Sequence, residues 1–213
     1  MKYLFLSMML FCGNSWASSY NDLPRGTTAE IVCVGDSIVW GGGSGFPLEL
    51  SRLTKKAVIN AGLPSDTSYG VFLRAREWIK TKPKYLIVQA GYNDNKYAIM
   101  RTNQQHLFRD ENDAYLSYQF HPITIADFQD FIDSIYNLCQ NYGVKVFFTT
   151  ISINPSSPPE PRLKFLNEIL KVYPDTIEIK LNSSHFVDMI HLNQEGYKEF
   201  AKQVYEAIIR YAR

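Results

Sequence analysis

Short runs of β-branched and aromatic residues alternate with amphipathic helical patterns along most of this chain. The strand-like runs are residues 30–34, 57–60, 85–90, 145–151 and 176–181. The helical patterns are residues 47–55, 69–80, 123–142, 162–173 and 194–210. Parallel strands need a crossover between them, usually a helix, and strands buried on both faces appear as continuous apolar runs. The alternation therefore predicts an α/β domain in which helices cover both faces of a parallel sheet.

Apolar residues at helical spacing support the helix assignments. One face of the helix predicted at 123–142 carries Phe128, Phe131, Ile132, Ile135, Cys139 and Tyr142. The helix predicted at 194–210 repeats the period with Tyr197, Phe200, Ala201, Val204 and Ile208. Asn193 precedes this last helix and is suited to cap its N-terminus. Without internal repeats or a domain linker, the expected architecture is a three-layer α/β/α domain with a five-stranded parallel, flavodoxin-like sheet.

Residues 1–17 have the pattern of a cleavable secretory signal peptide. Lys2 precedes a short apolar run, and Ser15 and Ala17 provide the small residues of a cleavage site. The run is too short for a stable membrane span. Cleavage after Ala17 would leave roughly 196 residues, 18–213, which is the size of one ordinary domain. The sequence therefore predicts a protein that is secreted or periplasmic after signal-peptide cleavage.

An alternative for the N-terminus is a lipid anchor at Cys12. It fits less well, because bulky Phe11 precedes the cysteine where such signals prefer a small residue. Cys12 would leave with a cleaved signal, so two cysteines remain in the predicted domain. Cys33 and Cys139 both lie in apolar patterns typical of buried thiols. Export would permit a disulfide between them, but we expect them to be unpaired.

The formal net charge of +1 gives no sign of a nucleic-acid or acidic-membrane partner. No apolar run after the signal is long enough to cross a bilayer. We therefore expect no nucleic-acid partner and no stable membrane insertion. The sequence leaves the oligomeric state open.

Polar motifs follow four of the predicted strands where each strand ends. They are Gly35-Asp36-Ser37 after the first strand, residues 60–68 after the second, Gly91-Tyr92-Asn93-Asp94 after the third, and Asp188 and His191 after the fifth. Ligands of open parallel sheets bind beyond the carboxyl ends of the strands. The four motifs are therefore expected to meet at one edge of the sheet.

These residue types match the requirements of serine chemistry. A nucleophilic serine needs a base to take its proton and a carboxylate to orient that base. Asp188 stands three residues before His191, so one turn can supply both partners to Ser37. Each motif alone also has a structural explanation, because Ser37 could cap a helix and Asn93 could belong to a turn. Their joint placement at one sheet edge favours a catalytic site.

With these four motifs in this order, the chain resembles the SGNH, or GDSL-type, hydrolase superfamily over essentially all of residues 18–213. Residues 60–68 are also similar to the matching block of bacterial thioesterase/lysophospholipase-type members. The resemblance implies that Ser37 is the nucleophile and that His191 is the general base and then the acid. It implies that Asp188 orients His191. It also implies an oxyanion hole formed by the Asn93 side chain and the backbone N–H of Ser37.

One position departs from the family pattern. The second sequence block of the superfamily has a glycine whose backbone N–H is a further oxyanion donor, and a gapless match places Ser65 there. Gly62, three residues earlier, is the nearest glycine. A backbone N–H survives a change from Gly to Ser where the dihedral angles suit a β-carbon. We therefore favour Ser65 as this donor and keep Gly62 as the second candidate.

Other signatures of catalysis are missing from the sequence. The glycine-rich residues 41–45 lack the Gly-Lys-Ser/Thr ending of a phosphate loop, and are expected to form a wall behind Ser37 with Trp40 beside the pocket. Ser37 also has no glycine two residues later, so the Gly-x-Ser-x-Gly elbow is absent. His106, His121 and His185 lack metal-ligand spacing. The sequence implies no cofactor and no metal.

The predicted reaction is hydrolysis of a carboxylic acyl ester through an acyl-enzyme, with a small-molecule, glycan or lipid ester as substrate. Two substrate classes stay open: short acyl groups such as acetyl on a glycan, and lysophospholipids or thioesters. The predicted loop at residues 95–122 mixes polar and apolar residues, and the Pro-rich residues 154–161 are expected to form a stiff rim. An O-acyltransferase acting on a glycan acceptor is an alternative function. A catalytically silent binding module is a further one.

Overall fold

The computed structural model describes residues 28–95, 123–157 and 160–213. The predicted signal peptide lies outside these ranges, as do nearly all of the loop predicted at 95–122 and its His106 and His121. The described residues form four strands: β1 (Ile31–Gly35), β2 (Val58–Gly62), β3 (Tyr85–Val88) and β4 (Lys145–Phe148). The principal helices are α1 (Ser37–Trp40), α2 (Gly45–Thr54), α3 (Ser68–Lys80), α4 (Ile125–Tyr142), α5 (Pro161–Lys171) and α6 (Gln194–Tyr211).

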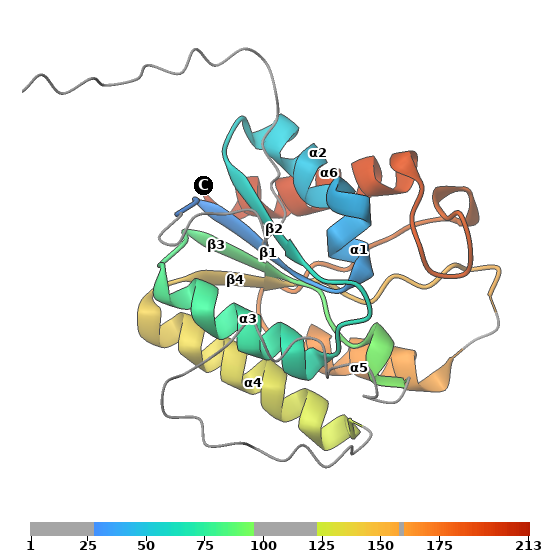
Figure 1. The fold of residues 1–213 in the computed structure, drawn as a ribbon, viewed down its shortest axis with the longest axis horizontal. Coiled ribbons are helices and arrows are strands. Elements are labelled where there is room, and N and C mark those ends of the chain that lie inside the picture. The colour runs from blue at the N-terminus through green and yellow to red at the C-terminus, as the bar shows by residue number, and fades with distance from the viewer. Residues whose placement is uncertain (1–27, 96–122, 158–159) are drawn as a thin grey trace, which may run out of the picture.

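The strands form one parallel sheet in the order β2-β1-β3-β4 (Figure 1). Ile31 of β1 pairs with Val58 of β2 and with Tyr85 of β3, so the three strands start and end nearly level. Nearly every strand residue is buried, which explains the continuous apolar runs in the sequence. The predicted parallel sheet is confirmed, and its carboxyl edge collects the segments that follow each strand.

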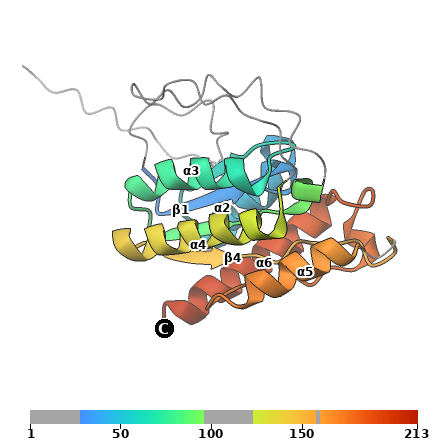
Figure 2. The same cartoon turned by 90° about the horizontal axis from the view of Figure 1, so that it is seen from below.

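Helices cover both faces of the sheet, as Figures 1 and 2 show. Alternate residues of β1 point to opposite faces. Ile31 and Cys33 pack with α1, α2 and α6, whereas Val32 and Val34 pack with α3, α4 and α5. Helices α2 and α6 contact each other on the first face, and α3 and α4 do so on the second. The three-layer α/β/α architecture expected from the sequence is confirmed.

Local capping explains where several helices begin and end. Thr124 accepts a hydrogen bond from the backbone N–H of Asp127 at 3.1 Å, and the Asp127 side chain bonds back to the N–H of Thr124. This reciprocal capping box starts α4. Asn193 caps α6 through the N–H of Gly196 at 2.9 Å, as predicted. Gly143 ends α4 in the left-handed conformation, with φ of 69°.

The fifth strand expected at residues 176–181 is reduced to a single bridge between Ile177 and Thr149. Side chains replace the remaining strand pairing. The hydroxyl of Thr150 accepts from the N–H of Ile179, and the side-chain amide of Gln203 in α6 bonds both main-chain groups of Lys180. This segment therefore runs beside β4 without joining the sheet as a strand, and the described sheet has four strands.

Cys33 and Cys139 are buried free thiols on opposite faces of the sheet. This confirms the expectation that they do not pair. Burial raises the pKa of the Cys139 thiol to about 12. Within residues 28–95, 123–157 and 160–213, no helix is both long and apolar enough to cross a membrane.

Candidate active site

The turn after β1 presents Ser37 at the carboxyl edge of the sheet. Gly35 ends β1 where a β-carbon would lie 2.3 Å from the side chain of Val39 and 2.6 Å from the carbonyl oxygen of Gln89. Asp36 caps α1, because its carboxylate accepts from the N–H of Ile38 at 2.9 Å. Ser37 is the first residue of α1, a position whose N–H has no partner inside the helix. The turn thus exposes a hydroxyl and a backbone donor on one residue.

Asp188 and His191 share a tight loop ahead of α6. An antiparallel bridge between Phe186 and Leu192 closes this loop. The Oδ1 atom of Asp188 accepts from the N–H groups of Ile190 and His191, at 2.7 and 2.6 Å. Its Oδ2 atom lies 2.8 Å from Nδ1 of the His191 ring. The three-residue spacing therefore lets one carboxylate hold both the loop backbone and the imidazole.

The other ring nitrogen of His191 reaches the serine. Its Nε2 atom lies 3.2 Å from Oγ of Ser37, although the two residues are 154 positions apart in the chain. The side chains of His191 and Asp188 are 43% and 51% exposed. The arrangement connects a hydroxyl, an imidazole and a carboxylate by hydrogen bonds in that order, which is the geometry needed to activate a serine.

The environment of Asp188 keeps its carboxylate ionised. Partial burial acts to raise its pKa, but hydrogen bonds from the His191 ring and from two backbone N–H groups outweigh burial and hold the pKa at about 2. A charged acceptor of this kind favours the His191 tautomer with its proton on Nδ1. The Nε2 atom is then left as the acceptor that faces Ser37.

The end of β2 and the segment that follows it hold the two candidates for the backbone oxyanion donor. Gly62 ends β2, and its N–H donates to the Asn60 side chain at 3.0 Å. A β-carbon on Gly62 would lie 2.2 Å from the backbone nitrogen of Trp40, so this glycine permits α1 to pack closely. Ser65 is exposed beside Ser37 and has φ of +62°. A non-glycine residue in this left-handed conformation costs roughly 1–2 kcal/mol.

Asn93 lies on the short 3-10 helix η3 (Tyr92–Asn95) that follows β3. Its side-chain nitrogen donates to the carbonyl oxygen of Asp66 at 2.9 Å. An amide group carries two N–H bonds, so one stays available for a ligand while the other holds the loop. Gly91, just before η3, has φ of +110° and packs so closely against Phe128 of α4 that a β-carbon would lie 2.8 Å from its ring.

A pocket of about 420 Å³ opens beside Ser37 and brings these segments together. Its larger side chains are Trp40, Pro64, Tyr92, Ile190, Leu192 and Tyr197, and its polar or small residues are Ser37, Gly41, Gly42, Ser65, Asn93 and His191. Gly62 does not line it. Trp40 lies beside the pocket, as predicted, and Gly41 and Gly42 of the glycine-rich segment line it. The ring of Tyr197 packs on Gly41, leaving only about 3.1 Å to a β-carbon there.

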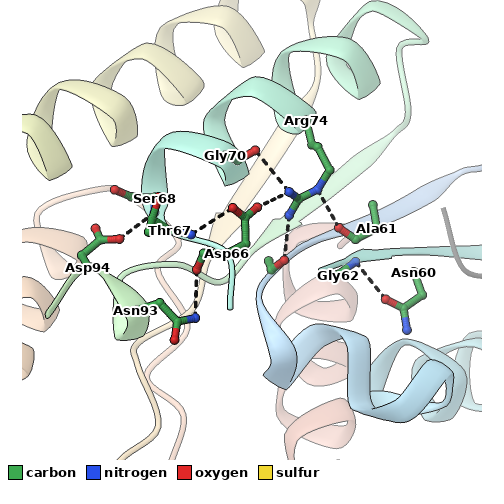
Figure 3. A network of polar contacts seen from close by, with 11 residues as sticks. Asn60, Ala61, Gly62, Asp66, Thr67, Ser68, Gly70, Arg74, Asn93 and Asp94 are labelled. Carbon is green, nitrogen blue, oxygen red and sulfur yellow. Dashed lines mark hydrogen bonds and ion pairs between the residues drawn. The ribbon is translucent and has the colours of Figure 1, made fainter. Parts of the chain in front are cut away.

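A buried ion pair next to Ser65 in the chain was not expected from the sequence. Arg74 of α3 and Asp66 are paired, and their side chains are only 2% and 0% exposed (Figure 3). Arg74 also donates to the carbonyl oxygens of Gly35 at 2.8 Å and of Ala61 at 3.2 Å. The signal that could have revealed it is a charged residue on the apolar face of α3, next to Ala75 and one turn from Val71 and Trp78.

Asp36 directly precedes the nucleophile in the chain and is buried close enough to Asp66 and Asp94 to be influenced by their charges. Complete burial, together with the nearby carboxylates of Asp66 and Asp94, raises the pKa of Asp36 to about 7. The hydrogen bond from the Ile38 N–H acts in the opposite direction. Asp36 is therefore a carboxyl group that exchanges its proton close to neutral pH, one residue before the serine.

A further residue supports the site from outside the predicted motifs. Asn154, in the Pro-rich segment after β4, donates to the carbonyl oxygen of Asp188 at 3.0 Å. His185 belongs to η4 (Ser183–His185), where its Nδ1 accepts from the N–H of Asn182 at 3.3 Å. Among the described residues, no group of three or more His, Cys, Asp or Glu side chains is arranged to hold a metal ion.

Solved structures with the same fold are numerous. A GDSL-like lipase from Bacteroides thetaiotaomicron VPI-5482 has 20% identity and a TM-score of 0.62, over 85% of this chain and 88% of that one. An acetylxylan esterase from Geobacillus stearothermophilus has 16% identity and a TM-score of 0.60, over 85% and 94%. A G-D-S-L family protein from Desulfitobacterium hafniense DCB-2 has 15% identity and a TM-score of 0.62, over 83% and 98%. At these identities the similarity establishes a shared fold.

The sequence itself settles the family. No curated protein matches it, but the profile of the GDSL-like lipase/acylhydrolase family matches residues 33–199. This match begins inside β1, ends inside α6 and contains Ser37, Asn93, Asp188 and His191. The chain therefore belongs to the GDSL-like lipase/acylhydrolase family and is a hydrolase of ester bonds.

Proposed function

We propose that this protein is a serine esterase in which Ser37, His191 and Asp188 form the catalytic triad. The observation that carries the proposal is the 3.2 Å contact between Oγ of Ser37 and Nε2 of His191, with Asp188 bonded to the far side of the ring. His191 takes the serine proton as Oγ attacks the ester carbonyl carbon. Asp188 keeps the ring oriented and stabilises its positive charge.

The reaction then follows two stages. In the first, the C–O bond to the alcohol breaks, His191 returns its proton to the leaving oxygen, and an acyl-Ser37 ester remains. In the second, His191 removes a proton from a water molecule that attacks the acyl carbon. Collapse of the second tetrahedral intermediate returns the proton to Ser37 and releases the carboxylic acid.

Three donors are proposed for the oxyanion of both intermediates. They are the N–H of Ser37, the second amide N–H of Asn93 and the N–H of Ser65. Preorganised donors of this kind supply much of the rate enhancement of acyl transfer. Ser65 is preferred to Gly62 because it lines the pocket, whereas the Gly62 N–H is bonded to Asn60. The left-handed backbone at Ser65 also accounts for the glycine of the family pattern at this position.

For the substrate, we propose a short acyl ester, such as acetyl, on a polar alcohol such as a sugar. The pocket mixes aromatic rings with polar groups, which suits a small acyl group and a polar alcohol. Two proteins with the same fold are acetylxylan esterases. A lysophospholipid or thioester substrate needs a longer apolar channel, and transfer to a sugar hydroxyl needs only that the sugar replace water.

A series of p-nitrophenyl esters of increasing acyl length tests this function. Wild type is expected to hydrolyse the acetyl ester fastest, and Ser37→Ala to lose roughly three orders of magnitude or more. Equal rates in the two proteins would remove Ser37 from the mechanism. A maximum at long chains would indicate a lipid substrate instead. Acylated sugar exceeding free acid, when a sugar acceptor is added, would show a transferase.

We also propose that the protein is exported and that its signal is cleaved after Ala17. The support is the charged start, apolar run and small residues of positions 1–17. Expression of the full chain in a bacterial host, followed by N-terminal sequencing of the periplasmic fraction, tests the proposal. A first residue at Ser18 is expected. An uncleaved protein confined to the cytoplasm would contradict it.

A further inference from the structure

Arg74 has more partners at the sheet edge than an ordinary ion pair requires. Its guanidinium is buried and meets the Asp66 carboxylate, while further N–H bonds reach the carbonyl oxygens of Ala61 and Gly70 (Figure 3). Another N–H bond reaches the carbonyl oxygen of Gly35. Gly35 and Ala61 lie at the ends of two neighbouring strands, β1 and β2. The rigid fork of an arginine can serve several acceptors at fixed angles, which a lysine ammonium cannot reproduce. One side chain therefore links two strand ends to the loop between β2 and α3.

On the loop side, Arg74 acts through Asp66, the residue that follows Ser65. The other oxygen of the Asp66 carboxylate accepts from the N–H of Thr67 at 2.9 Å. The N–H of Asp66 bonds to the carbonyl of Leu63 at 3.2 Å, and its carbonyl oxygen accepts from the Asn93 side chain. Every polar group of Asp66 is thus held. The neighbouring Ser65 has a left-handed backbone conformation. Such a sparsely populated conformation persists only where the surrounding structure determines it.

On the strand side, Arg74 reaches the segment that carries the nucleophile. The carbonyl of Gly35 receives both an Arg74 N–H at 2.8 Å and the backbone N–H of Leu63 at 2.9 Å. Gly35 stands two residues before Ser37, and the helix-capping residue Asp36 lies between them in the chain. The bonds of Arg74 therefore join the turn that presents Ser37 to the loop that presents Ser65. Asn93 is joined to the same loop through Asp66.

Stability alone is a weak explanation for this pair. Replacing a buried ion pair by apolar residues of similar volume is often neutral or stabilising. An oxyanion hole, by contrast, is sensitive to small displacements of its donors, because its benefit depends on preorganisation. We propose that Arg74 is a positioning residue, which holds the Ser65 N–H and the Asn93 amide against Ser37 through Asp66 and Gly35. This inference rests on the proposed esterase function.

Two variants test the inference without leaving an unpaired buried charge. Arg74→Lys keeps the positive charge beside Asp66 but loses the fork. The double variant Asp66→Asn with Arg74→Met removes both charges. Both are expected to lower kcat by about tenfold to hundredfold, which is less than the loss of a whole oxyanion donor. The KM for a short p-nitrophenyl ester is expected to stay within about twofold, because ground-state binding does not use the oxyanion donors.

Binding of an alkylboronic acid provides a readout of the oxyanion site itself. Boron adds to Ser37 as a tetrahedral adduct whose hydroxyl occupies the oxyanion position. If Arg74 positions the donors, its variants weaken boronate inhibition by the same factor as kcat/KM. Competitive inhibition by a neutral aliphatic alcohol, which carries no oxyanion, stays unchanged. Tyr173→Phe is the matched control, since it removes a partly buried hydrogen bond to Asp133 at 2.7 Å outside the pocket lining.

The outcomes separate this inference from the proposed function. An active wild type, an inactive Ser37→Ala and an unchanged kcat in both Arg74 variants would overturn the positioning role alone. A purely structural role of Arg74 would lower kcat, boronate binding and alcohol binding in equal proportion. The Tyr173→Phe control, compared at the same melting temperature, would then show the same losses. Equal rates in wild type and Ser37→Ala would overturn the proposed function and this inference together.

Discussion

The two sides of the active site are built in opposite ways. His191 and Asp188 lie on a surface loop, are about half exposed, and are held mainly by hydrogen bonds among residues close in sequence, with Asn154 as a more distant donor. Ser65 and Asn93 are held by a buried network whose bonds connect residues as far as 39 positions apart. Groups that transfer protons tolerate exposure and some adjustment, whereas oxyanion donors act through preorganisation. The comparison predicts that mutations on the two sides separate activity from stability.

The largest effect is expected from Asp188→Asn on the exposed side. An amide neither stabilises an imidazolium nor fixes the productive tautomer, so kcat/KM should fall by about 10³–10⁴. The free energy of unfolding should change by less than about 1 kcal/mol, because the pair is exposed and screened. Ester hydrolysis and urea denaturation measure the two quantities. A loss of several kcal/mol in unfolding free energy would show that the loop of Asp188 contributes as much to stability as the buried network does.

A large loss of stability is expected from Asp66→Ala on the buried side. The change leaves the Arg74 guanidinium buried without its carboxylate, which typically costs about 3–5 kcal/mol. Urea denaturation measures the difference in unfolding free energy. Glu77→Ala in α3, the helix of Arg74, is the control, since its partners Arg76 and Lys80 are exposed and the cost should stay below about 1 kcal/mol. Similar costs for both variants would contradict the contrast between the two sides.

Asp36 is the buried residue that precedes Ser37, and its contribution to stability should depend on pH. Its folded pKa of about 7 exceeds the ordinary value of 3.8, so between these pH values the folded protein binds more protons than the unfolded chain. Wild-type stability from this group therefore falls as pH rises from about 4 to 7. Asp36→Asn, which cannot ionise, should therefore become increasingly more stable than wild type as pH rises over the same interval. The gain should reach up to about 4 kcal/mol above pH 7, since one pKa unit corresponds to about 1.4 kcal/mol.

Thermal or urea unfolding of both proteins across pH 4 to 8 checks this difference. The Asn side chain keeps an oxygen for the cap on Ile38, so loss of the cap should not mask the result. A difference in stability that is constant over the whole range would show that Asp36 does not titrate in it.

The smallest effect is expected from Ser65→Gly. Glycine relieves the left-handed backbone conformation but adds conformational freedom to the unfolded chain, so stability should change by about 1 kcal/mol or less. The backbone N–H remains in place, and kcat should stay within about twofold. Steady-state kinetics measure this outcome. A large rise in kcat would show that the serine side chain displaces the donor in the native protein.

The elements were largely predictable because their signals are local. Helical spacing and capping residues located α4 and α6 within two residues, and apolar runs located β1 to β4. The expected strand at 176–181 was wrong as a strand, because Thr150 and Gln203 satisfy its backbone groups in place of strand partners. Short α1 was also missed, since four residues after a glycine turn carry no helical period.

The sequence by itself determined the succession of strands and helices along the chain, the family, and the residue types at the carboxyl edge of the sheet. These follow from periodicity and from motifs whose residues lie within a few positions of one another. Only the tertiary structure showed that His191 reaches Ser37, that the Gly62 N–H is bonded to Asn60 while Ser65 faces the pocket, and that Arg74 joins the two strand ends. Such contacts join residues from different elements, and their distances depend on packing that no local pattern records.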